Sequence, residues 1–193
     1  ISMTDESVFE VGRNIANTEG AVVFENELMQ LIQYAPLTPK VGALPLVVVP
    51  PCINKFYIMD LQPDNSLIRF MVDQGNTVFL VSWRNPTEAQ GHLTWEDYLE
   101  HGPIAALHVA QEICKVKQVN TLGFCVGGTI LTSALSVLKG RGEDIAASLT
   151  LMTTLLDFSD TGEIGLFIDD NALASREATI GKGKEALCPV SLV

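Results

Sequence analysis

The sequence predicts an α/β fold with a doubly wound, mostly parallel sheet. Four short runs rich in β-branched residues are apolar on both faces, as expected of strands that are covered on both sides. Stretches of helical length lie between these runs, and strands that alternate with helices form crossover units with parallel strands. The strand runs cover residues 46–49, 77–81, 119–122 and 147–151.

Three stretches between or after these strands have the apolar spacing of helices. The first is expected over Met59–Gln74. The second begins at Thr94-Trp95-Glu96-Asp97, where the Thr hydroxyl can cap the helix, and runs towards Ile113 with a kink at Gly102-Pro103. The third covers residues 126–138 and is apolar nearly all round, so we expect a central, buried helix.

Two more strands are expected before this alternating region. Residues 20–34 contain two β-rich runs joined by Glu25-Asn26-Glu27, which predicts a tight hairpin and an antiparallel N-terminal edge. After Leu156 the alternating pattern is lost. We therefore expect the sheet to be truncated before its last strands.

The composition is that of one globular domain, with 193 residues of which 47% are hydrophobic and 18% charged. A formal net charge of −11 argues against nucleic-acid binding, which needs clustered Lys and Arg. The four cysteines have neither CxxC pairing nor zinc-like spacing, so we expect reduced thiols in a cytoplasmic protein and no metal site. Neither a signal peptide nor a transmembrane segment is predicted.

The motif that indicates catalysis is Gly123-Phe124-Cys125-Val126-Gly127, which follows a predicted strand and begins a predicted helix. It matches G-x-S-x-G with Cys in place of Ser, the nucleophile elbow of the α/β-hydrolase fold. Such a turn presents Cys125 at the carboxyl end of the sheet and at a helix N-terminus, whose dipole stabilises a thiolate. Cys125 is therefore the candidate nucleophile.

An oxyanion hole for this nucleophile needs two backbone N–H groups. The first would be that of Val126, directly after the nucleophile. The second would come from the loop after the predicted strand 46–49, which is stiffened by Pro50 and Pro51. Within that loop we favour Ile53 over Cys52, which we interpret as a small apolar residue.

Two other interpretations of the motif are open. Buried cysteines are commonly inert, so Cys125 could be a packing residue. A dinucleotide-binding turn also joins a strand to a helix, but its G-x-G-x-x-G spacing is absent here. Cys114 and Cys188 are assigned no role.

No convincing base accompanies the nucleophile. In this architecture the order along the chain is nucleophile, acid, His, yet His92, His101 and His108 all precede Cys125. We interpret all three as surface or helix-packing residues, and Asp157 as a turn or cap residue. The chain begins with Ile and ends in a weakly patterned tail, so we expect a fragment that lacks the catalytic Asp and His.

From about Met3 to Thr179 the chain resembles the catalytic domain of class I poly(3-hydroxyalkanoate) synthases, the poly-beta-hydroxybutyrate polymerases of the α/β-hydrolase superfamily. The elbow alone would not be specific, but the set of matching strings is. They are TDES (4–7), VVFEN (22–26), PPCINK (50–55), VSWRNP (81–86), TWEDY (94–98), GFCVGGT (123–129) and TLLDF (154–158).

The resemblance implies that Cys125 accepts a 3-hydroxyacyl group from coenzyme A as a thioester. The hydroxyl of another unit, or of the growing chain, then extends a polyester. It also implies that residues 1–156 are the N-terminal part of the catalytic domain and that residues 157–193 begin a cap or lid. The implied partners are 3-hydroxyacyl-CoA, the growing polyester chain, the polyester granule surface and a second copy in a homodimer. No cofactor is implied.

Two other functions remain open at this point. A thioesterase, esterase or polyester depolymerase would use the same elbow with water as the acceptor. A non-catalytic fragment would only bind a partner subunit or a polymer granule. The sequence does not predict the preferred acyl chain length.

Overall fold

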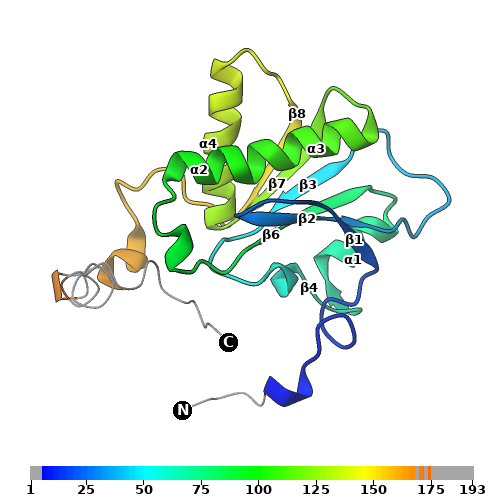
Figure 1. Ribbon diagram of the computed structural model, residues 1–193, viewed down its shortest axis with the longest axis horizontal. Coiled ribbons are helices and arrows are strands. Elements are labelled where there is room, and N and C mark those ends of the chain that lie inside the picture. Colours follow the sequence, from blue (N-terminus) through cyan, green and yellow to red (C-terminus); the bar gives the residue numbers. More distant parts are fainter. Residues whose placement is uncertain (1–5, 168–169, 172–173, 175–193) are drawn as a thin grey trace.

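The computed structural model describes residues 6–167, 170–171 and 174, and its core is a six-stranded sheet (Figure 1). Four strands run parallel, and the first two pair antiparallel at one edge. The predicted mostly parallel sheet with an antiparallel N-terminal edge is therefore confirmed. In spatial order the strands are β1 (Gly20–Glu25), β2 (Met29–Tyr34), β6 (Val78–Trp83), β3 (Leu46–Val49), β7 (Val119–Phe124) and β8 (Ala146–Met152).

Helices cover both faces of the central strands, whose alternate residues point to opposite sides. The edge strand β8 is largely exposed, so the expectation that its run is covered on both faces is wrong. Val47 and Val49 of β3 pack on one side, under α2 (Trp95–Leu99), the π-helical turn η4 (Glu100–Ile104), α3 (Ala105–Cys114) and α4 (Val126–Gly140). Val48 packs on the other side, with η2 (Phe56–Met59) and α1 (Leu67–Asp73). The stretch from α2 through η4 to α3, called the α2–α3 rod, crosses the strands in Figure 1.

The helix predicted over Met59–Gln74 is wrong in its first half. Residues 60–66 form a small hairpin of β4 (Asp60–Gln62) and β5 (Asn65–Ser66), and α1 begins only after Ser66. The Pro63-Asp64 pair favours a turn, and the Ser66 side chain accepts a hydrogen bond from the Arg69 N–H, which caps α1. Local turn and cap chemistry therefore overrides the apolar spacing.

The second helix has the predicted start and the predicted interruption. Thr94 and Asp97 form a capping box, in which each side chain bonds to the other residue's backbone N–H. Gly102 departs from helical torsions, with φ −98° and ψ −108°, next to Pro103, which has no N–H to donate. This break lies over the sheet near the end of β6.

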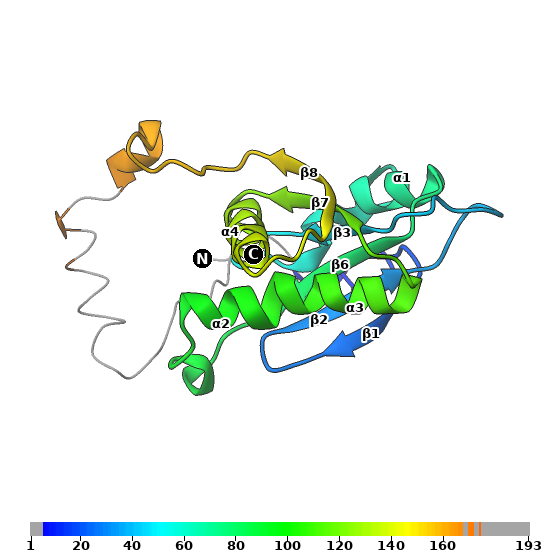
Figure 2. The ribbon, with the colours of Figure 1, turned by 90° about the horizontal axis from the view of Figure 1, so that it is seen from above.

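The segment after β8 leaves the body of the molecule (Figure 2). It leads to η5 (Gly162–Phe167). Most of residues 157–193, where a cap was expected, lie outside the described residues, as does Cys188. The division at residue 156 stays a prediction.

Buried Asp60 ties the N-terminal segment to the hairpin before α1. Its side chain is 0% exposed, and its Oδ1 accepts hydrogen bonds from the hydroxyls of Thr18 and Ser66, both at 2.6 Å. The Ala16 N–H donates to the Asp60 carbonyl at 2.9 Å. One carboxylate therefore joins three stretches of chain.

We predict that Asp60→Ala lowers the free energy of unfolding by about 3 kcal/mol, because two partly buried hydroxyls lose their acceptor. Urea unfolding followed by circular dichroism measures the change. Asp64→Ala, in the exposed turn of the same hairpin, is the matched control and should change stability by less than about 0.5 kcal/mol. Equal effects of the two substitutions would contradict the role given to Asp60.

Candidate active site

Cys125 lies at the turn between β7 and α4, in a backbone conformation that side chains rarely adopt. Its φ is 54° and its ψ −131°, a strained combination that costs about 1–3 kcal/mol. The turn is held from both sides, because the Cys125 N–H donates to the Met152 carbonyl and the Cys125 carbonyl accepts from the Gly128 N–H, both at 2.9 Å. This is the geometry of the predicted elbow.

The elbow closes because glycines stand where the backbones of the strand, the loop and the helix come closest. A Cβ on Gly127 would lie 2.3 Å from the Val49 carbonyl oxygen and 2.4 Å from that of Pro50. A Cβ on Gly123 would lie 2.4 Å from the Cα of Gly128. The start of α4 thus packs directly against β7 and against the end of β3.

The loop that follows β3 lies beside this elbow. The Asn54 N–H donates to the Pro51 carbonyl at 3.4 Å, which closes a turn with Cys52 and Ile53 at its centre. Ile53 is 45% exposed, whereas Pro50 and Pro51 are buried. Within the described part of the chain, neither the Ile53 N–H nor the Val126 N–H has a hydrogen-bond acceptor. The oxyanion role of these two groups stays a prediction.

Cys52 lies near Cys125, and Tyr98 lies near Cys52. Burial raises the pKa of the Cys52 thiol, and the nearby negative charge of a Cys125 thiolate raises it further. The pKa of Tyr98 is likewise raised by burial and then by Cys52. Cys52 also packs against the main apolar cluster, which agrees with its interpretation as a small apolar residue. Tyr98 was not singled out from the sequence, because helical spacing does not show which face of a short helix meets a loop.

The histidines lie on the surface, as the sequence suggested. His92 and His101 are exposed, and the Nε2 of His108 is 2.9 Å from the Glu143 carboxylate, also at the surface. Asp157 accepts a hydrogen bond from the Ser159 N–H, which lowers its pKa and makes it a turn residue. In residues 6–167, 170–171 and 174, no three His, Cys, Asp or Glu side chains gather as metal ligands.

Comparison with protein-family models agrees with this architecture. The model described as the poly-beta-hydroxybutyrate polymerase (PhaC) N-terminus matches residues 1–71, and the alpha/beta hydrolase fold model matches residues 45–191. The chain belongs to the alpha/beta hydrolase fold family. Among its described helices, none combines the length and the apolar character that crossing a membrane requires.

Within this family the chain is similar to curated poly(3-hydroxyalkanoate) polymerases. It is 62% identical to the polymerase subunit PhaC of Cupriavidus necator over 188 residues. This alignment covers 97% of this chain and 32% of the relative. It is 41% identical to PhaC of Rhizobium meliloti, over 93% of this chain and 30% of the relative. The resemblance noted in the sequence is confirmed, and the chain spans about a third of the length of these relatives.

Solved α/β-hydrolase structures share the fold at low sequence identity. The HSL homologue EstE7 from a metagenome library superposes with a TM-score of 0.56 at 14% identity, covering 91% of this chain and 60% of its own. The Ser161Ala mutant of LAE6, an alpha/beta hydrolase from the metagenome of Lake Arreo, Spain, also gives 0.56 at 14% identity, covering 88% and 56%. These likenesses concern the fold alone.

We predict that iodoacetamide labels Cys125 at least about tenfold faster than Cys52 at pH 7.5, because only the thiolate reacts and burial keeps Cys52 protonated. Since the pKa of Cys52 is raised, its labelling should increase only as the pH rises beyond the ordinary thiol range. Peptide mass spectrometry over time measures both rates, and Cys125→Ser is the control. Faster labelling of Cys52 would contradict Cys125 as the more reactive of the two thiols.

The close approach at Gly127 gives a second prediction, because an added methyl group there meets rigid backbone. Gly127→Ala should lower the free energy of unfolding by about 3 kcal/mol or more. Gly140→Ala, in the same helix with nothing within 4 Å of the added Cβ, should be neutral or stabilise by about 0.5–1 kcal/mol. Thermal unfolding compares the two, and a tolerated Gly127→Ala would refute the tight elbow.

Proposed function

We propose that this chain carries the nucleophile half of a polyhydroxyalkanoate synthase, an acyltransferase that polymerises (R)-3-hydroxyacyl-CoA and releases CoA. The observation that carries the proposal is a cysteine held at positive φ on a strand-to-helix turn, in a chain 62% identical to a poly(3-hydroxyalkanoate) polymerase subunit. A strained, presented side chain beside free N–H groups is the arrangement that acyl transfer needs.

In the first step the Cys125 thiolate attacks the thioester carbonyl of 3-hydroxyacyl-CoA. The negative charge that forms on the carbonyl oxygen would be bound by the N–H groups of Val126 and Ile53. Collapse of this tetrahedral intermediate breaks the bond to the CoA sulfur, and CoA leaves as a thiolate that takes up a proton. The acyl group is then a thioester of Cys125.

In the second step the hydroxyl of another acyl unit, or of the growing chain, attacks the Cys125 thioester. The hydroxyl loses its proton, an ester bond forms, and Cys125 departs as a thiolate. Cysteine suits this cycle better than serine. Transfer between two thioesters is nearly balanced in free energy, and a thiolate leaves readily in the following step.

The hydroxyl proton requires a base, and among the described residues no hydrogen bond joins a histidine side chain to Cys125. We therefore expect negligible polymerisation by the 193-residue chain alone. We extend the proposal to the partners that the resemblance implies, which are the acyl-CoA substrate, the growing polyester, the granule surface and a second copy in a homodimer, and to a cytoplasmic location.

The test is a chimera in which this chain replaces the matching 188 residues of the Cupriavidus necator polymerase. We expect CoA release from 3-hydroxybutyryl-CoA, coupled to insoluble polyester, and at least about a thousandfold loss of that release in Cys125→Ala. A thiol reagent measures CoA, and gas chromatography after methanolysis measures the polymer.

The products distinguish the alternatives. Free 3-hydroxybutyrate in place of polymer would establish a hydrolase that uses water as the acceptor. A chimera that folds but releases no CoA would favour a binding role. The unmodified Cupriavidus necator polymerase is the positive control in each assay.

A further inference from the structure

The indole of Trp83 holds one carbonyl group of the loop that follows β3. Trp83 is the last residue of β6, is only 9% exposed, and donates from its Nε1–H to the Pro50 carbonyl at 2.9 Å. The bond is buried and joins residues 33 apart in the chain. Because an unpaired buried carbonyl is costly, this bond sets the orientation of the peptide unit that follows Pro50.

The same carbonyl also lies against the elbow. A Cβ on Gly127 would come within 2.4 Å of the Pro50 oxygen and 2.5 Å of its carbon. The Pro50 carbonyl therefore lies between the Trp83 indole and the helix that begins after Cys125. Its direction fixes how closely the loop can approach the nucleophile.

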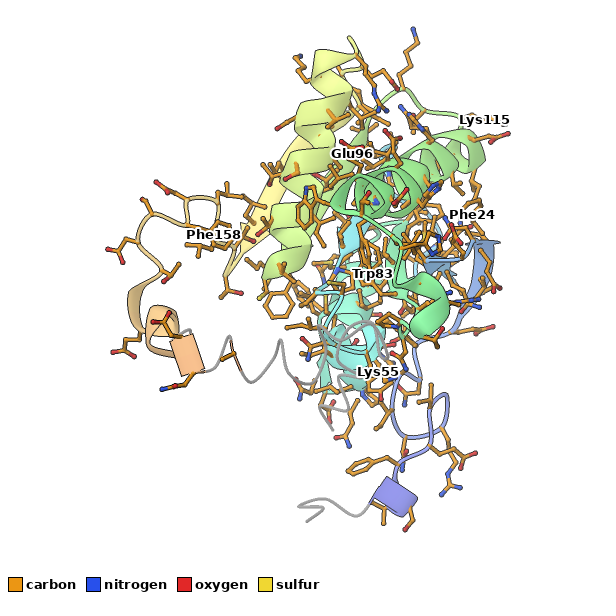
Figure 3. All side chains as sticks on the ribbon, turned by 60° about the vertical axis from the view of Figure 1, so that its left-hand side comes forward. Phe24, Lys55, Trp83, Glu96, Lys115 and Phe158 are labelled. Atoms are coloured by element: carbon orange, nitrogen blue, oxygen red, sulfur yellow. The ribbon has the colours of Figure 1, made fainter. Side chains whose placement is uncertain are left out.

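The helical layer fixes the Trp83 ring from its other side. The ring centroid of Tyr98 lies 5.8 Å away at a tilt of 33°. A Cβ on Gly102 would lie 2.5 Å from the Cη2 atom of Trp83, so the interrupted turn between α2 and α3 is what admits the indole. Figure 3 shows Trp83 in the interior, between the strands and this layer.

The path from Pro50 to Ile53 is short and stiff. The pyrrolidine rings of Pro50 and Pro51 fix two φ angles, and the hydrogen bond from the Asn54 N–H to the Pro51 carbonyl closes the turn. Cys52 packs into the apolar cluster that also contains Trp83. Few torsions are left free, so a rotation of the Pro50 carbonyl is passed on to the Ile53 N–H.

We propose that Trp83 is a positioning residue that aims the Ile53 N–H at the reacting carbonyl by holding the Pro50 carbonyl, and that Gly102 is required to seat its ring. This inference rests on the proposed acyl transfer at Cys125. Trp83 touches no reacting atom and acts through the loop.

The experiment uses the chimera and replaces Trp83 with 3-benzothienylalanine, which keeps the shape of the ring and lacks only the N–H donor. We expect kcat for CoA release to fall about tenfold with KM unchanged, because an oxyanion donor serves the transition state and not the bound substrate. Amide hydrogen exchange of the peptide containing residues 50–55 should become faster.

Two further variants separate positioning from general stability. Gly102→Ala, which crowds the ring, should also lower kcat, whereas Gly140→Ala should leave kcat, KM and exchange unchanged. In an Ile53→Pro background, which has no N–H at residue 53, the Trp83 replacement should cause no further loss of kcat.

Unchanged exchange in the Trp83 replacement would overturn the proposal, and so would faster exchange with unchanged kcat. An additive loss in the Ile53→Pro background would show that Trp83 acts by another route and would also overturn it. If the parent chimera releases no CoA, the proposed function fails, while the exchange experiment still decides whether Trp83 orders the loop.

Discussion

The contact on which the site depends is that between the first turn of α4 and the end of β3. The helix comes so close that a side chain on Gly127 would overlap the carbonyl oxygens of Val49 and Pro50. Because the helix starts there, Cys125 must turn sharply between strand and helix and adopts a positive φ. The strain at this residue is offset by ordinary hydrogen bonds to Met152 and Gly128, so the Cys125 side chain is presented without loosening the fold.

The sheet and the elbow could be predicted because their signals are local. Apolar runs such as Val47-Val48-Val49 indicate strands covered on both faces, and the structure buries all three. The glycines around Cys125 are close in sequence to the residue they serve, so a short motif contains most of the information. The capping box at Thr94 and the break at Gly102 are local in the same sense.

The remaining features depend on contacts between distant residues. The hydrogen bond from the Thr18 hydroxyl to Asp60 joins residues 42 apart, so no local pattern predicts it. The bond from Trp83 to Pro50 and the position of Tyr98 beside Cys52 arise only when β6 and the α2–α3 rod meet the loop after β3. Periodicity indicates which residues are buried but not which distant group each one meets.

The hydrogen bonds that Thr18 and Ser66 donate to Asp60 limit where the chain can be cut without exposing its sheet. The two family models overlap over residues 45–71, and Asp60 lies inside this overlap while its partner Thr18 lies in the N-terminal match alone. The strand β2 also belongs only to that first match, yet it pairs along β6, from Met29 opposite Trp83 to Gln33 opposite Phe79. One sheet and the hydrogen bonds of Asp60 thus span the two matched regions. A chain shortened to begin at residue 45 would leave β6 as an open sheet edge, a template for self-association, so the two family regions are expected to be inherited and exchanged together.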